Sequence, residues 1–185
     1  MRAAGRRAAT AVALLVVAGC GPVVSADPAP TTAEVRTDAS CLDPGVLDAL
    51  GLELDPSLRT AAPVATVRGL PPEGFAPDVA LVCDRGETLR DSAGRWWAVS
   101  ATLLEGDLRP LVDVVARTTP AVRCGAGVVA QVWLIDAMGA AVLLPREAAC
   151  ADDRVPAALA DLSVVDRTEH PVALAQAVTA DAPAP

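Results

Sequence analysis

Two apolar segments of the chain, residues 128–136 and 140–145, meet across the tetrapeptide Asp136-Ala137-Met138-Gly139. Aspartate in the first position and glycine in the fourth are typical of a type I turn, in which the carboxylate accepts hydrogen bonds from backbone amides. Short apolar runs on both sides of such a turn are typical of strands. The pattern predicts a β-hairpin in this stretch.

A second hairpin is predicted by residues 79–85 and 95–105, which flank the similar turn Asp91-Ser92-Ala93-Gly94. After each hairpin, an aspartate that can act as an N-cap precedes apolar residues at helical spacing: Asp107 with Leu111, Val114 and Val115, and Asp153 with Leu159 and Leu162. We therefore expect an α+β fold with a mainly antiparallel sheet, built from two hairpins that are each followed by a short helix.

The remaining segments are shorter. Asp43-Pro44 predicts a two-turn helix that ends at Gly51, because aspartate caps a helix and proline is favoured in its first turn. Five prolines between residues 51 and 77 exclude any long element there. One more strand is expected at residues 162–167, and residues 171–185 are expected to be a disordered or frayed tail. Residues 41–170 then form a single globular domain.

The first 19 residues are typical of an export signal. Three arginines precede an apolar stretch at residues 8–18, which is shorter than the ~20 residues that span a membrane. Val17-Ala18-Gly19-Cys20 resembles the bacterial lipobox, which predicts acylation of Cys20 and an anchor on the outer face of the cytoplasmic membrane. The alternative is an ordinary signal that is cut after Ala26. The pair Arg6-Arg7 leaves the export route open between general secretion and twin-arginine transport.

Residues 20–40 are rich in proline, alanine and threonine and predict a flexible tether between the anchor and the domain. Beyond Cys20 the chain has four cysteines, which in an exported protein predict two disulfides. Cys124 and Cys150 lie at equal distances, within one residue, from the turn at Ala137-Met138, so that we expect a Cys124–Cys150 bridge. Cys41 and Cys83 are then expected to form the second bridge.

The net charge of −8 disfavours nucleic acid as a partner, because an acidic surface repels phosphates. A metal or redox site is disfavoured as well, since the chain has no CxxC motif and His170 is its one histidine. Adjacent carboxylates occur at Glu105 with Asp107 and at Asp152 with Asp153, but the helix-cap interpretation of Asp107 and Asp153 is the simpler one. We expect no catalytic residue and no cofactor.

Two tryptophans are candidate contacts for a ligand or a protein partner. Trp96 lies on the opposite side of its predicted strand from Trp97, and Trp133 shares its side with Gln131. An exposed tryptophan can stack on a sugar or anchor a partner, whereas the alternative for both rings is a place in the core.

A loose succession of residues between positions 79 and 162 resembles uncharacterised secreted lipoproteins of high-GC Gram-positive, actinobacterial species: Cys83, Trp97, Asp107, Leu111, Cys124, Trp133-Leu134-Ile135-Asp136, Gly139, Pro145, Cys150 and Leu159. The resemblance implies lipidation at Cys20 and paired cysteines, and it carries no catalytic residue.

The leading hypothesis is a membrane-anchored extracytoplasmic lipoprotein with a non-enzymatic binding or scaffolding role in the cell envelope, where its partner is an envelope protein or a small ligand. A small-ligand receptor is the second hypothesis and predicts a pocket of ~300 Å³ or more near Trp96 or Trp133. An envelope hydrolase is the third, and it requires carboxylates from distant segments to meet in one cleft.

Overall fold

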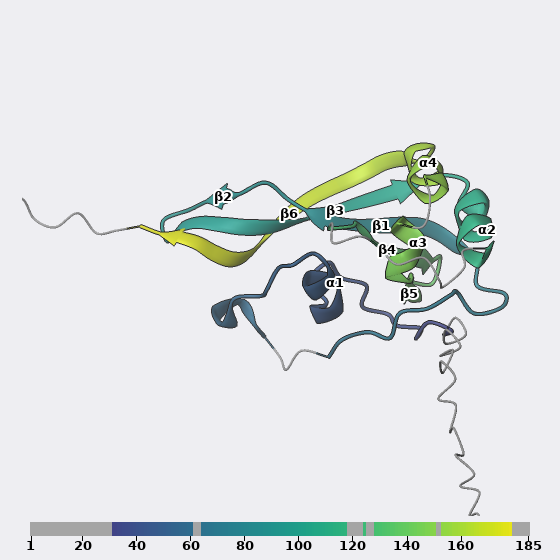
Figure 1. Ribbon diagram of the computed structural model, residues 1–185, viewed down its shortest axis with the longest axis horizontal. Coiled ribbons are helices and arrows are strands. Elements are labelled where there is room, and N and C mark those ends of the chain that lie inside the picture. Colours follow the sequence, from purple (N-terminus) through teal and green to yellow (C-terminus); the bar gives the residue numbers. More distant parts are fainter. Residues whose placement is uncertain (1–30, 61–63, 118–123, 125–127, 151–152, 179–185) are drawn as a thin grey trace, which may run out of the picture.

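A computed structural model describes residues 31–60, 64–117, 124, 128–150 and 153–178 (Figure 1). Its helices and strands follow the order α1 (Pro44–Ala49), the 3₁₀ turn η1 (Pro56–Leu58), β1 (Pro77–Arg85), β2 (Leu89–Arg90), β3 (Gly94–Glu105), α2 (Arg109–Arg117), β4 (Gln131–Asp136), β5 (Ala141–Leu143), α3 (Arg146–Cys150), α4 (Arg154–Ala160) and β6 (Ser163–Ala177).

All six strands belong to one sheet, and every pairing between them is antiparallel. β1 pairs with β3 on one side and with β4 on the other, and β4 then pairs with β5. β3 also pairs with the short β2 and, along its whole length, with β6. The expected α+β fold with a mainly antiparallel sheet is confirmed.

Each face of the sheet packs against helices, because successive side chains of a strand point to opposite faces. One face joins α2, α3 and α4 in a core that includes Ala80, Leu104, Leu111, Val115, Val132, Leu134, Ala148 and Val155. The opposite face joins α1 in a second core that includes Cys41, Val46, Leu47, Leu50, Cys83, Val99, Trp133, Leu143 and Val172. Figure 1 shows α2 and α4 at one end of the sheet, while the long β3–β6 pair reaches toward the other.

The two predicted turns have the hydrogen bonds that aspartate brings to such turns. Asp91 Oδ1 accepts from the backbone N–H groups of Ala93 and Gly94, at 2.8 and 3.1 Å. Asp136 Oδ1 accepts from those of Met138 and Ala140, at 2.9 and 2.8 Å. Gly139 has a φ of 82°, a conformation that glycine adopts without strain.

Both predicted disulfides are present. Cys41 and Cys83 are bridged with their Cα atoms 5.3 Å apart, and Cys124 and Cys150 with theirs 5.5 Å apart. The first bridge fastens the segment before α1 to β1, and the second fastens Cys124 to the end of α3. The geometric argument from the hairpin therefore selected the right pairing out of three.

The C-terminal part differs from the expectation. β6 spans Ser163–Ala177 and runs through Pro171, where the sequence placed the start of a frayed tail. β3 has a free side along its whole length and can hold this long strand. Pro171 lies opposite Ala98, next to a register shift, and strands tolerate a proline at such irregular positions. Within the predicted tail, residues 171–177 are thus strand, and residues 179–185 lie outside the described part.

The structure confirms only part of the predicted helix caps. α1 begins after Asp43 as predicted. Asp107 accepts from the backbone N–H of Arg109 at 3.1 Å, at the start of α2. Asp153, in contrast, has a helical backbone conformation and makes no capping hydrogen bond to α4. α3 was not expected from the sequence.

Candidate functional site

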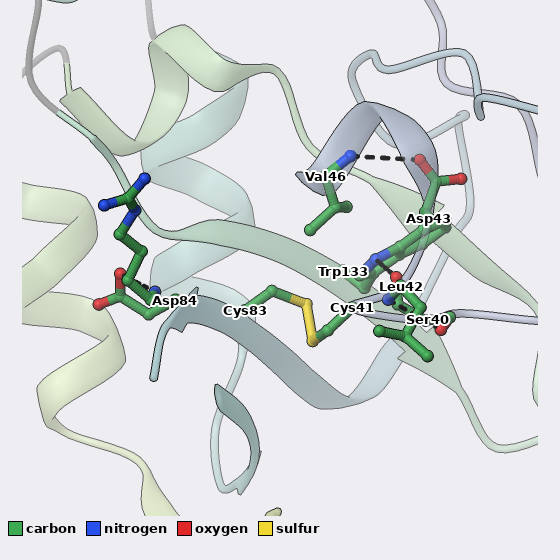
Figure 2. The surroundings of a disulfide bond; sticks show 9 residues. Ser40, Cys41, Leu42, Asp43, Val46, Cys83, Asp84 and Trp133 are labelled. Carbon is green, nitrogen blue, oxygen red and sulfur yellow. Dashed lines mark hydrogen bonds between the residues drawn. A yellow bond between two sulfur atoms is a disulfide. The ribbon is translucent and has the colours of Figure 1, made fainter. Parts of the chain in front are cut away.

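The best-defined cluster of side chains surrounds Trp133, in the core between the sheet and α1. Trp133 is 0 % exposed and packs in the same core as the bridge between Cys41 and Cys83. Its Nε1–H donates to the backbone carbonyl of Ser40 at 3.2 Å, next to that bridge (Figure 2). Since the ring is buried and its polar atom has a partner, Trp133 is a structural residue of this core.

Asp43 holds the N-terminus of α1 and a distant segment at the same time. Its Oδ1 accepts from the backbone N–H groups of Gly45 and Val46, at 2.8 and 3.3 Å. Its Oδ2 accepts from the backbone N–H and the hydroxyl of Thr66, at 3.1 and 2.6 Å. One carboxylate therefore ties residues 64–70 to the start of α1.

Gln131 and Arg68 form a second polar connection on this face. The guanidinium of Arg68 donates to Oε1 of Gln131 and to the carbonyl of Gly45, and Nε2 of Gln131 donates to the carbonyl of Val129. Burial lowers the pKa of Arg68, and the nearby carboxylate of Asp43 opposes this effect. Gln131 is buried with its amide bonded on both sides, so its place beside Trp133 has a structural explanation.

The outer side of α1 bounds an open pocket of about 740 Å³. Residues from α1, η1 and the segments beside them line it: Ser40, Leu42, Pro44, Leu47, Asp48, Gly51, Leu52, Glu53, Leu54, Leu58, Arg59 and Thr60. Arg59 is held at the pocket by donating to the carbonyl of Leu54 at 2.9 Å and to Glu53 at 3.4 Å. The pocket combines a leucine-rich wall with a few charged groups, as ligand sites do.

This pocket lies on the same face of the sheet as Trp133 but is separated from the ring. Leu47 lines the pocket and also belongs to the core around Trp133, while Ser40 lines the pocket and bonds the indole. A ligand in the pocket would therefore touch α1 and not Trp133. Sequence reasoning missed the pocket because its wall combines residues of α1, η1 and the segments beside them, which share no motif.

The other candidate tryptophan is also buried. Trp96 is 9 % exposed, its Nε1–H donates to Asp91 Oδ1 at 2.9 Å, and it lies opposite Leu89 of β2 and Leu174 of β6. Trp97, which was not a candidate, is 48 % exposed. The core alternative therefore describes Trp96 and Trp133, and neither ring offers the exposed surface that a contact with a ligand or partner requires.

The candidate carboxylates are occupied with structural contacts or lie apart from the pocket. Asp107 pairs with the Arg109 guanidinium at 2.7 Å, and this hydrogen-bonded pair lowers the pKa of Asp107 to about 2. Glu105 lies opposite Val79 at the end of β3, and Asp152 lies outside the described residues. Within the described part of the chain, no group of three or more His, Cys, Asp or Glu side chains has an arrangement that could hold a metal ion.

Across the ranges that the structure describes, none of the helices has the length and apolar character needed to cross a membrane. Cys20, the predicted lipidation site, lies outside those ranges.

A scan of protein-family models and searches of curated proteins and of solved structures found no match to this chain.

Proposed function

We propose that the protein is a lipid-anchored, extracytoplasmic lipoprotein with a binding or scaffolding role in the cell envelope. The observation that carries this proposal is the pairing of all four cysteines of the domain in two disulfides, since such bridges persist in oxidising compartments outside the cytoplasm. The basic, apolar leader that ends at Cys20 supports the anchor. Both features concern the location of the protein. Under this proposal, the disulfide-bonded domain, in a chain with a net charge of −8, makes the contacts with a partner.

The anchor is tested by Cys20→Ala in the full chain, followed by fractionation of producing cells and by incorporation of labelled palmitate. We expect the variant to take up no label and to leave the membrane fraction. Ser25→Ala, which changes the predicted tether and leaves the lipobox intact, should keep the label and the membrane association. Unchanged membrane retention and labelling of Cys20→Ala would refute the proposal.

A small-ligand receptor is the second candidate, and the pocket beside α1 favours it. Its volume of about 740 Å³ is in the range of small-molecule sites, and several leucines form its wall. The ligand that fits such a wall has an apolar body. Under this candidate, α1 and η1 are the binding elements, and the core behind them keeps α1 in place.

The receptor candidate is tested with an apolar fluorescent probe, 8-anilinonaphthalene-1-sulfonate, whose emission rises in apolar sites. Leu58→Glu should weaken probe binding at least about tenfold, because it puts a charge into the leucine wall. Leu174→Glu is the matched control, since both leucines are 38 % exposed and Leu174 lies in β6, away from the pocket. Equal probe binding by both variants would exclude the pocket as the site.

A further inference from the structure

β6 lies at an edge of the sheet with its outer side open. One side of the strand pairs with β3 along Gly94–Glu105, and no other strand of the described residues pairs with it (Figure 1). The first six residues of β6, 163–168, are all exposed. An edge strand of this kind presents a row of N–H and C=O groups that can pair with another strand.

The open stretch has defined limits. At its far end, the carbonyl of Val172 accepts from the backbone N–H of Asp55 at 2.6 Å, so that a loop beside η1 meets β6 there. The register with β3 shifts on both sides of a regular stretch, in which Asp166 to Pro171 lie opposite Leu103 to Ala98. Residues 166–171 are therefore the part of β6 that is both regular and accessible to a new strand.

We propose that this stretch pairs with the same stretch of a second copy of the chain, antiparallel and centred on Thr168. In a symmetric antiparallel pair the two-fold axis is perpendicular to the sheet, so facing residues share a face of it. Because side chains alternate between the faces, one residue must face its own copy across the axis. An axis midway between two neighbouring residues would pair side chains from opposite faces. This condition leaves few registers for the stretch.

The charges of the stretch select among these registers. A pair centred on Asp166, Arg167 or Glu169 puts that charge opposite its own copy, and like charges directly opposite are destabilising. A pair centred on His170 places Thr168 opposite Val172, where Asp55 already occupies the edge.

Centring on Thr168 puts no like charges of the stretch opposite each other. Arg167 then faces Glu169 of the second copy, and Asp166 faces His170 of the second copy, each twice by symmetry. Within one chain, Arg167 and Glu169 are already oriented together, with Nη2 and Oε1 3.3 Å apart. The same charges oppose pairing in other registers, so the edge admits one partner arrangement and disfavours others. The exposed Val165, which then faces Pro171 of the second copy, would lose solvent contact on pairing.

The register is tested by cysteine crosslinking of the full chain in the membranes of producing cells. Thr168→Cys places two thiols opposite each other with Cα atoms ~4.5–5.5 Å apart, within the range of a disulfide. Mild oxidation should give a covalent dimer on a non-reducing gel. Val165→Cys is the control, because its two copies lie about 20 Å apart in this register, at ~3.3 Å per residue, and it should remain monomeric like the parent chain. A monomeric Thr168→Cys, or equal crosslinking of both variants, would overturn the proposal.

Charge exchange tests the same register without a new thiol. Arg167→Glu puts a glutamate opposite Glu169 of the second copy at both symmetric positions, and it should raise the dimer dissociation constant at least about tenfold, measured by sedimentation of the detergent-solubilised full chain. Adding Glu169→Arg restores opposite charges and should restore the dimer. Because the Glu169 carboxylate lies against Gly86, circular dichroism must show that the double variant is folded. An unchanged dissociation constant for Arg167→Glu would contradict the register, whatever the double variant does.

Discussion

Two regions of the sheet have the same alternation of side chains but differ in the elements that cover them. One is the core between α1 and the sheet, and the other is the pair of strands β3 and β6, called the ribbon below. In the core, Trp133 is fully buried, its indole N–H is bonded, and a disulfide lies in the same cluster. On the ribbon, Trp97 shares a face of β3 with the buried Val99 but is half exposed. Covering elements, and not the strand pattern, decide which tryptophan is core.

The largest expected difference between the two regions is the effect of removing a tryptophan. Trp133→Ala should lower the free energy of unfolding by about 3–5 kcal/mol, because it leaves a large cavity in a closed core. Trp97→Ala should lower it by about 1 kcal/mol or less, since its ring already contacts solvent. Urea unfolding of the two variants measures both values, and equal losses would show that the ribbon is covered in solution.

Removing each of the two disulfides should also affect stability to a different extent. From the loops of 42 and 26 residues that they close, chain entropy predicts losses of about 4 and about 3.5 kcal/mol when each pair is replaced by alanine. Cys41 and Cys83 are also buried in the Trp133 core. Replacing Cys41 and Cys83 together should therefore lower stability more than replacing Cys124 and Cys150 does. The gap between the two losses should exceed the difference of about 0.5 kcal/mol that chain entropy alone predicts. Thermal unfolding of the two double variants tests this, and the reverse order would contradict it.

Asp43 and Asp153 give a matched pair of aspartates at helix starts. Asp43→Ala removes hydrogen bonds to Gly45, Val46 and Thr66 and should cost about 2 kcal/mol. Asp153→Ala removes no capping bond and should change stability by less than about 0.5 kcal/mol. Chemical unfolding distinguishes them, and a large loss at Asp153 would mean that its carboxylate caps α4 in solution.

The smallest expected effect is at Asp91, the exposed turn residue of the ribbon. The hydrogen bond from Trp96 Nε1–H, with those from Ala93 and Gly94, holds the pKa of Asp91 below its ordinary value of 3.8. A carboxyl whose pKa is lower in the folded state stabilises above the ordinary pKa, and this contribution disappears as the pH falls through the folded pKa. Asp91→Asn should therefore reduce stability slightly at pH 7, with a difference from the parent that shrinks as the pH falls below 3.8 and vanishes below the pKa of the folded state. A difference that grows toward acid pH would contradict the assignment.

The sequence predicted the elements whose signals are local. The turns at Asp91 and Asp136, the start of α1 at Asp43 and the Cys124–Cys150 bridge all depend on residues near in the chain or symmetric about a turn. The burial of Trp96 and the exposure of Trp97 depend on what packs against each side of β3, which no pattern within β3 encodes.

Two of the features that sequence reasoning missed depend on distant partners. Arg68 and Gln131 meet across 63 positions. β6 extends through Pro171 because β3 offers a free edge of matching length, although proline and charged residues argue locally against a strand. The pocket, in contrast, is lined by residues 40–60 of α1, η1 and the segments beside them, which share no motif.

The Cys41–Cys83 bridge has a consequence for proteolysis. It encloses the proline-rich stretch between α1 and β1, which includes the exposed residues 57–60. A protease that cuts there produces two fragments that stay covalently joined, because the N-terminal piece remains attached to β1. If Cys20 carries the proposed anchor, a nicked protein therefore stays on the membrane until a reductant releases the sheet.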